Sequence, residues 1–247
     1  MFMRIDKLLC ELNMGSRSQV KELIRKGAVQ VNGQVVKKPE TKVDALADQI
    51  ICAGKICRYQ LFVYYMMNKP QGVITATQDA SAKTVMDLFR EQYGKRNRGD
   101  ITGIPLKDMF PVGRLDKDTE GLLLITNNGA LAHELLSPAK HVPKQYFVRL
   151  DGALSTKQAG QLECGVTIGS GEKTKPAIVE GVGSDQCYIT ITEGKFHQVK
   201  RMFQAVGLTV TYLKRMSMGS LLLDEHLAPG EIRELTENEV KELCSRE

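Results

Sequence analysis

The feature that most constrains the fold is a polar loop bounded by glycines, residues 113–121, which runs directly into an apolar segment, residues 122–125. The loop carries Arg114, Asp116 and Asp118. A short, continuous apolar run beside turn residues is typical of a buried strand. We therefore expect a charged loop anchored to a rigid element, an arrangement that can position chemical groups. By spacing alone, the two aspartates also fit surface turn residues whose side chains bond nearby backbone amides.

Length and composition indicate a folded protein without a membrane anchor. A chain of 247 residues holds one large domain or two modest ones, and 42% apolar residues argues against disorder. No segment approaches the roughly 18 uninterrupted apolar residues of a membrane span, and the charged N-terminus shows no secretory signal. The six cysteines form no Cys-x-x-Cys pair and have no histidine at ligand spacing. We expect a cytoplasmic protein with reduced thiols and no metal site.

The net charge of +5 is concentrated at one end of the chain. Residues 1–60 contain 11 Lys or Arg and 6 Asp or Glu, whereas residues 61–247 contain 23 of each sign. A basic module ahead of a neutral body is typical of a phosphate-binding appendage on an enzyme. A solvated charged face without a ligand would give the same excess of positive charge. Charge alone therefore does not distinguish a phosphate-binding module from a solvated surface.

The first fifty residues have the pattern of a small module of two helices and a hairpin. Apolar residues at positions 5, 8, 9 and 12 fall on one helical face. Ser16 and Gln19 form a capping box for a second helix, which Gly27 ends. Asn32-Gly33 between two alternating segments predicts a hairpin. Six basic residues form a stripe on and beside the helices: Arg4, Lys7, Arg17, Lys21, Arg25 and Lys26.

This segment resembles the S4 RNA-binding domain over about residues 3 to 50. The resemblance rests on Arg4-x-Asp6-Lys7-Leu8-Leu9 and on the run from Gly15 to Gly33. It implies binding of folded RNA through phosphate and shape contacts, with the basic stripe as the contact surface. Residues 51–63 would form the connection to the body. We therefore predict two domains, an S4 domain with its linker over residues 1–60 and a second domain over residues 61–247.

Three predicted strands of the body lie beside polar motifs: a strand in residues 64–73 that a Pro/Gly turn ends, and strands at residues 143–150 and 188–192. The second strand carries Tyr146, which by spacing alone is an ordinary half-buried aromatic residue. The third strand precedes a turn and a helix that carries Lys200 and Arg201. Residues 94–100 are polar and basic, and we expect a surface loop there, for which solvation is a simpler explanation than RNA contact.

Together these motifs resemble those of the RNA pseudouridine synthases. The pattern Gly-Arg-Leu-Asp-x-x-Thr-x-Gly-Leu-Leu-Leu matches residues 113–124, Asn-Lys-Pro-x-Gly matches residues 68–72, and Lys-x-Tyr-x-Val matches residues 144–148. A last core motif matches residues 193–203. The resemblance implies an α+β fold, in which a small N-terminal S4 domain precedes a catalytic domain with a mixed, largely antiparallel sheet flanked by helices.

The resemblance also implies roles for individual residues. Asp116 would be the catalytic residue, and Lys200 would pair with it and keep it ionised, with Arg201 as the alternative partner. Tyr146 would stack on the target base and is a candidate for proton transfer at C5. Arg114, Leu115 and Arg201 would bind substrate, with Arg114 placed to fill the space that an extruded uridine leaves.

Two further expectations concern residues around these motifs. The Asn-Lys-Pro-x-Gly segment would support the catalytic loop. The four histidines, at positions 133, 141, 197 and 226, stand alone in the sequence and are expected to be structural.

The implied reaction breaks the N1–C1′ glycosidic bond of a uridine, turns the uracil and joins C5 to C1′. It involves no redox change or group transfer, so we expect no cofactor. Asp116 would either attack the nucleotide or promote glycal formation, and the sequence leaves both routes open. The motifs point to the ribosomal small-subunit branch, which implies the uridine numbered 516 in 16S ribosomal RNA as substrate.

Two alternatives to this assignment remain open at the level of sequence. A sister branch of the family acts on 23S ribosomal RNA with the same chemistry. A non-catalytic S4-type RNA-binding factor in ribosome assembly would keep a similar body, although it would have no need for Asp116, Tyr146 and Lys200 together. No obligate protein partner and no membrane partner is implied.

Overall fold

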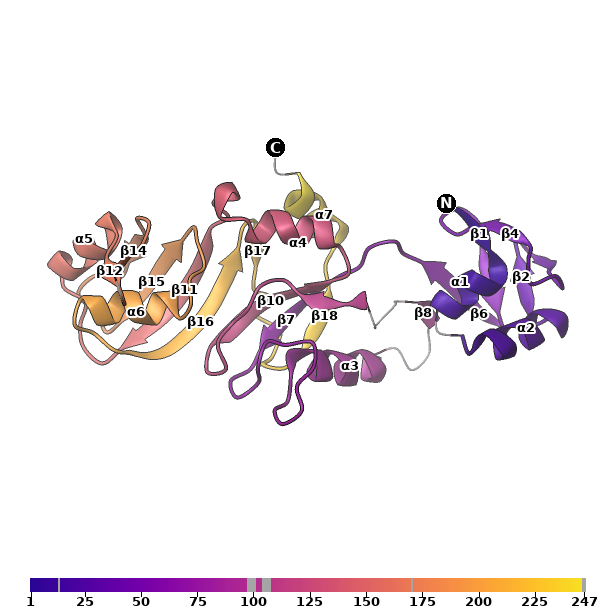
Figure 1. Ribbon diagram of the computed structural model, residues 1–247, viewed down its shortest axis with the longest axis horizontal. Coiled ribbons are helices and arrows are strands. Elements are labelled where there is room, and N and C mark those ends of the chain that lie inside the picture. Colours follow the sequence, from indigo (N-terminus) through magenta and orange to yellow (C-terminus); the bar gives the residue numbers. More distant parts are fainter. Residues whose placement is uncertain (13, 97–100, 104–107, 170, 246–247) are drawn as a thin grey trace. The chain divides into compact units, whose positions relative to one another are not determined.

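The computed structural model describes residues 1–247 except 13, 97–100, 104–107, 170 and 246–247 (Figure 1). The chain divides into two compact units. Unit 1 consists of Met1–Val63 and Arg90–Met109, and unit 2 of Tyr64–Phe89 and Phe110–Glu247. The predicted division after residue 60 lies close to the first of these boundaries. It did not anticipate that residues 90–109 group with the N-terminal unit.

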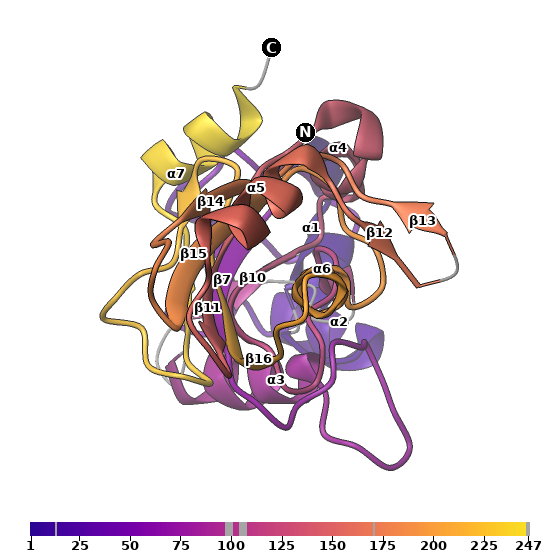
Figure 2. The same ribbon diagram turned by 90° about the vertical axis from the view of Figure 1, so that its left-hand side faces the viewer.

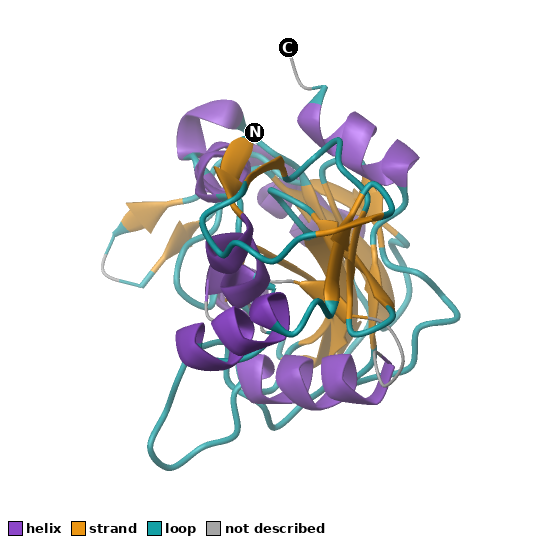
Figure 3. Cartoon of the chain, turned by 90° about the vertical axis from the view of Figure 1, so that its right-hand side faces the viewer, coloured by secondary structure: helices purple, strands orange, loops and turns teal. Residues whose placement is uncertain are grey.

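Two helices of unit 1 confirm the predicted N-terminal pattern. They are α1 (Ile5–Glu11) and α2 (Arg17–Arg25), which pack on each other near the N-terminus (Figure 3). The four apolar residues predicted to share one helical face are all buried. Ser16 and Gln19 form the predicted capping box, in which each side chain accepts a hydrogen bond from the other residue's backbone N–H.

Two small sheets complete unit 1. One pairs β1 (Phe2–Arg4) with β4 (Lys42–Asp44), and the other has the order β3 (Gln34–Val35), β2 (Val29–Val31), β5 (Ile50–Cys52), β6 (Lys55–Tyr59) and β8 (Ile101–Gly103). The predicted hairpin turns at Asn32-Gly33, both with positive φ. The expectation that residues 51–63 merely connect two domains is wrong, because β5 and β6 form a second hairpin. Its turn residues, Ala53 and Gly54, also have positive φ, a conformation that alanine does not signal in a sequence.

The sheet of unit 2 contains nine strands. Seven form a continuous path in the order β14 (Ile178–Glu180), β15 (Gln186–Ile191), β11 (Lys144–Leu150), β16 (Val210–Met218), β10 (Glu120–Thr126), β7 (Tyr64–Lys69) and β18 (Ile232–Glu234). β17 (Leu221–Leu222) pairs with β16, and β9 (Phe110–Pro111) pairs with β10. β10 and β16 run parallel, and the other pairs are antiparallel. The predicted mixed, largely antiparallel sheet is therefore confirmed.

Helices flank this sheet, as predicted (Figures 1 and 2). They are α3 (Val85–Arg96), α4 (Gly129–Leu136), α5 (Thr156–Cys164), α6 (Gln198–Ala205) and α7 (Glu237–Cys244). A 3-10 turn (Pro138–Lys140) and a two-stranded ribbon, β12 (Thr167–Ile168) with β13 (Glu172–Lys173), complete unit 2. α5 packs on β14, and α6 packs on β16 and β12 (Figure 2).

Helices cover both faces of β7 and β10. On one face, Tyr65 packs edge-to-face on Phe89 of α3, with ring centroids 5.2 Å apart. On the other face, Leu122 and Leu124 share a buried cluster with apolar side chains of α4 and α7. Every residue of β7 is buried, as are six of the seven residues of β10. This double burial explains the continuous apolar run at residues 122–125, which does not alternate as a half-exposed strand would.

The predicted surface loop at residues 94–100 needs correction. Gly94–Arg96 form the last turn of α3, which continues past the buried ring of Tyr93. The rest of that predicted loop, residues 97–100, lies outside the described residues. Within the described part of the chain, no helix is long and apolar enough to cross a membrane.

Candidate active site

The polar loop at residues 113–121 connects β9 to β10, and the side chain of a buried lysine donates hydrogen bonds to its backbone. Lys69, the last residue of β7, is fully buried. Its ammonium group donates to the carbonyl oxygens of Asp116 at 3.0 Å, Thr119 at 2.8 Å and Pro70 at 3.0 Å. Burial lowers the pKa of Lys69 to about 8. The expected supporting role of the Asn-Lys-Pro-x-Gly segment is confirmed.

Two further contacts fix the backbone of this loop. The hydroxyl of Thr75 donates to the carbonyl of Leu115 at 2.8 Å and accepts from the N–H of Leu115 at 3.1 Å. The N–H of Gly72 donates to the carbonyl of Lys117 at 2.8 Å. Because both neighbours of Asp116 are hydrogen-bonded in this way, its side chain projects from a rigid backbone.

The loop ends where two strands approach most closely. Gly121 has a φ of +105°, and a Cβ atom at this position would lie 2.3 Å from the carbonyl oxygen of Arg215. The two residues are partners in the parallel pairing of β10 with β16. Only glycine fits both the backbone conformation and the space.

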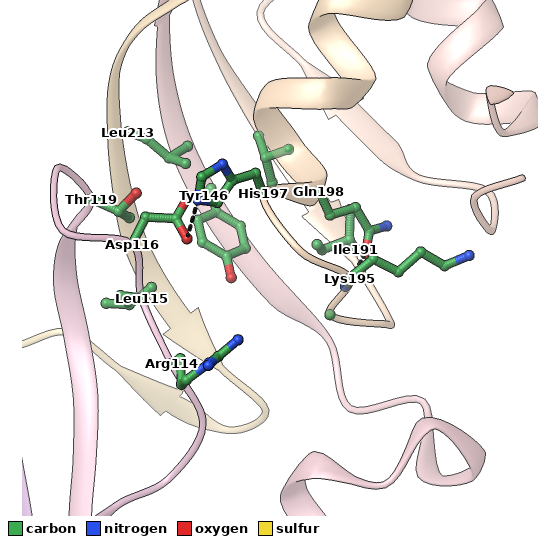
Figure 4. A pocket seen from close by; sticks show the side chains of 12 residues that line it. Arg114, Leu115, Asp116, Thr119, Tyr146, Ile191, Lys195, His197, Gln198 and Leu213 are labelled. Carbon is green, nitrogen blue, oxygen red and sulfur yellow. Dashed lines mark hydrogen bonds and ion pairs between the residues drawn. The ribbon is translucent and has the colours of Figure 1, made fainter. Parts of the chain in front are cut away.

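The loop forms one wall of a pocket (Figure 4). Arg114, Leu115 and Asp116 line it together with Tyr146 of β11, so the structure brings four of the predicted site residues together. The pocket continues into a wider hollow of about 490 Å³ that α4 and the 193–197 turn also border. This volume lies within the range of small-ligand sites.

Lys200, from the first turn of α6, reaches the loop. Its ammonium group lies 3.4 Å from Oδ2 of Asp116 and 2.5 Å from Oδ1 of Asp118. The hydrogen bond from Lys200 lowers the pKa of Asp118. The pairing predicted for Lys200 therefore exists, but two carboxylates share it. It is also not fully buried, since the side chains of Asp116 and Lys200 are 26% and 23% exposed.

His197 also contacts Asp116, contrary to the expectation that the four histidines are only structural. Its Nε2 lies 3.5 Å from Oδ1 of Asp116 (Figure 4), and its backbone has a φ of +48°. The ring stacks on Phe196 with centroids 3.9 Å apart, and Phe196 is 67% exposed at the edge of the hollow. Its position three residues before Lys200 was the signal that could have identified His197.

Arg201 points elsewhere. Its guanidinium lies 3.6 Å from Glu172 and donates to the carbonyl of Phe196 at 3.1 Å. Of the two predicted partners for Asp116, the structure brings only Lys200 to it. A substrate-binding role for Arg201 stays a prediction.

The hollow contains cations that the sequence analysis missed. Lys144 and Arg215 are buried and line it, together with Lys195 and the predicted Arg114. The body is neutral as a whole, yet five lysines and arginines line this hollow against only two carboxylates, Asp116 and Glu193. The sequence did not reveal this because the lining comes from β11, β16 and the 193–197 turn, which only the fold assembles.

The predicted RNA-binding stripe of unit 1 separates into two groups. Three members have acidic neighbours: Arg4 with Asp6 at 2.8 Å, Lys7 with Glu11 at 3.7 Å and Lys26 with Glu22 at 2.7 Å. The other three, Arg17, Lys21 and Arg25, have no ion pair among the described residues. They follow one side of α2, and their contact with phosphates stays a prediction.

Comparison with known proteins agrees with this geometry. Residues 63–205 match the family model described as RNA pseudouridylate synthase, and residues 3–50 match that of the S4 domain. The chain belongs to the RNA pseudouridine synthase family. This synthase carries an N-terminal S4 domain, as the sequence predicted. Among its described residues, no group of three or more His, Cys, Asp or Glu could hold a metal ion.

Full-length relatives support the assignment. The synthase is 49% identical over 242 residues to the RNA pseudouridine synthase YtzG of Bacillus subtilis, covering 96% of this chain and 97% of that protein. It is 36% identical over 239 residues to ribosomal small subunit pseudouridine synthase A of Escherichia coli, covering 96% and 98%. A crystal structure of a pseudouridylate synthase, 33% identical, matches with a TM-score of 0.65 over 98% of this chain and 99% of that one.

Proposed function

We propose that this synthase converts one uridine of 16S ribosomal RNA to pseudouridine, the uridine numbered 516, with Asp116 as its catalytic residue. The observation that carries the catalytic assignment is the position of Asp116, on a rigid loop, against Lys200 and in one pocket with Tyr146. Support for the substrate comes from the small-subunit synthases of Escherichia coli and Haemophilus influenzae, 36% and 35% identical over nearly the whole chain.

The proposed mechanism assigns each group a separate task. The uridine leaves its stack at a cost of a few kcal/mol, and Arg114 fills the space it leaves. Its base enters the pocket against the ring of Tyr146. His197 and Lys200 lie beside the two carboxylate oxygens of Asp116 and orient the group that acts on the nucleotide.

The bond changes balance within the substrate. The N1–C1′ bond breaks, and its electron pair leaves with the uracil. The uracil turns, a bond forms between C5 and C1′, and the proton on C5 is passed to N1 through a base in the pocket. No external oxidant, reductant or group donor takes part.

The first test compares two aspartates of the same loop. Asp116→Asn should fold and bind RNA but form no pseudouridine, whereas Asp118→Asn should keep measurable activity because Lys200 retains Asp116 as a partner. Single-turnover assays on 16S ribosomal RNA, with binding measured in parallel, give both quantities. Normal turnover by Asp116→Asn would refute the catalytic assignment.

The second test concerns the substrate. Pseudouridines are mapped in 16S and 23S ribosomal RNA from a strain that lacks the gene and from the same strain carrying it again. We expect loss and recovery of one 16S pseudouridine. Loss of a 23S pseudouridine instead would assign this chain to the sister branch, and no change at all would favour the non-catalytic assembly factor.

A further inference from the structure

A buried arginine in the hollow has no assigned task. Arg215 of β16 is 2% exposed, and its Nε donates to the carbonyl of Leu122 at 2.7 Å. Its Nη2 is buried without a hydrogen-bond partner, and no carboxylate of the described residues pairs with the guanidinium. A buried guanidinium normally has a hydrogen-bond partner for its N–H groups and a carboxylate beside it, because an unpaired buried charge is strongly unfavourable. The side chain nevertheless lines the hollow, where a ligand could reach it.

The position of Arg215 is fixed on two sides. It is the strand partner of Gly121, which ends the catalytic loop, and of Tyr146, whose ring borders the pocket. Glycine at position 121 allows the two backbones to approach closely, and the pairing of β16 with strands on both sides fixes its position. The guanidinium therefore lines the hollow between the end of the 113–121 loop and Tyr146.

We infer that Arg215 donates a hydrogen bond to a carbonyl oxygen of the extruded uracil and stabilises the negative charge that this base acquires during the reaction. The inference rests on the proposed function of the pocket. When the N1–C1′ bond breaks, the electron pair that leaves with the uracil is delocalised onto O2 and O4. A donor held in place beforehand in a pocket with little water stabilises such a developing charge strongly.

A base fits this site better than a phosphate does. A guanidinium that is 2% exposed can be reached only by a group that enters the hollow, and the base is the part of a flipped nucleotide that does so. Phosphates would meet the cations nearer the opening, such as Lys117, which is exposed. The guanidinium of Arg215 can only donate, so at C4 it favours the carbonyl oxygen of uracil over the amino group of cytosine.

The test combines protein variants with altered substrates. The substrate is a ribosomal RNA fragment that the wild-type protein modifies, prepared with uridine, 2-thiouridine or 4-thiouridine at the target, since sulfur is a weaker hydrogen-bond acceptor than oxygen. Variants are Arg215→Gln, Arg215→Lys and, as a control, Lys214→Gln, whose side chain projects from the opposite face of β16. Single-turnover rates at saturating RNA, dissociation constants and unfolding midpoints are measured for each.

We expect Arg215→Gln to slow the chemical step by on the order of tenfold to a hundredfold with a much smaller change in RNA affinity. Arg215→Lys should recover part of the rate, and Lys214→Gln should match the wild type. One of the two thio substitutions should slow the wild-type protein severalfold but leave the rate of Arg215→Gln nearly unchanged, because the interaction it weakens is already lost.

Other outcomes overturn the inference. If Arg215→Gln folds and remains as sensitive to both thio substitutions as the wild type, Arg215 does not contact the base. A loss of affinity with an unchanged rate at saturation would assign Arg215 to a phosphate. If Arg215→Gln does not fold, Arg215→Lys answers the same question. Failure of the wild-type protein to modify any ribosomal RNA would instead refute the proposed function.

Discussion

The Lys200 ammonium is shared between Asp116 and Asp118, and both the aspartate and the lysine of the predicted pair retain contact with water. An exposed pair contributes about 1 kcal/mol or less, whereas breaking a fully buried pair costs about 3–5 kcal/mol. Lys200 therefore matters more for the orientation of Asp116 than for the stability of the fold.

This distinction gives a prediction about Lys200→Met. The variant should lower the free energy of unfolding by only about 1 kcal/mol but lose most of its activity, because Asp116 loses its cation. Arg201→Met is the matched control, since its partners are Glu172 and the Phe196 carbonyl. Denaturant unfolding and single-turnover rates measure the two effects. Full activity of Lys200→Met together with an inactive Arg201→Met would reverse the assignment.

At the scale of elements, patterns that are local in sequence gave correct predictions. The apolar face of α1, the capping box of α2, the Asn32-Gly33 hairpin and the doubly buried β10 depend on neighbours a few residues apart. β16 was missed because the strand carries Lys214 and the buried Arg215, so it shows no clear apolar alternation. Lys144 was missed because only the assembled sheet brings it to the hollow, whereas the spacing of three residues between His197 and Lys200 is a local signal for His197.

The junction of β10 with β16 allows a direct test of packing. Gly121→Ala should lower the free energy of unfolding by at least about 3 kcal/mol, since it combines an unfavourable φ with a clash against backbone. Gly160→Ala, within α5 and with no atom within 4 Å of the added methyl group, should be neutral or stabilising by up to about 1 kcal/mol. Equal stability of the two variants would show that β10 and β16 can separate without cost.

The C-terminal helix gives a pH-dependent prediction. Glu239 of α7 forms a two-point ion pair with Arg233 of β18, at 2.7 and 2.9 Å, which lowers the pKa of this carboxyl to about 2. Because the pKa is lower in the folded state, the stabilisation is complete above the unfolded value of 4.5 and is lost as the pH falls toward 2.

Glu239→Gln should therefore be less stable than the wild type by about 2 kcal/mol at pH 7, and the difference should shrink as the pH falls below 4.5. Glu242→Gln, an exposed residue of the same helix, serves as the control. Chemical denaturation across this pH range measures both. A difference that does not depend on pH would show that the ion pair does not stabilise α7.

At the scale of the whole molecule, we expect the two basic groups of unit 1 to contribute differently to RNA affinity. Arg17→Gln, Lys21→Gln and Arg25→Gln combined should weaken RNA binding and flatten the slope of log affinity against log salt by roughly two units, if all three charges meet phosphates. The same change at Arg4, Lys7 and Lys26 removes equal charge but only cations that already have acidic neighbours.

Binding titrations at several salt concentrations compare the two triple variants, with single-turnover rates at saturating RNA as the second measurement. The first triple variant should lose much more affinity than the second, and neither should alter the rate at saturation, since these residues lie outside the catalytic pocket. Equal losses would mean that unit 1 attracts RNA by total charge, and no loss would assign the binding to the cations of the hollow.

The parallel pairing of Gly121 with Arg215 has a consequence for the protein during its synthesis. The two strands of this pair lie roughly a hundred residues apart in the chain, so they meet late in folding. The chain must lose the entropy of closing a long loop before the contact between the strands stabilises it. Unit 1 contains mostly neighbouring segments and can fold as they emerge from the ribosome. The polar loop at residues 113–121 cannot be fixed against β16 until that strand has been translated. A nascent chain would therefore acquire its affinity for RNA well before it acquires catalytic competence.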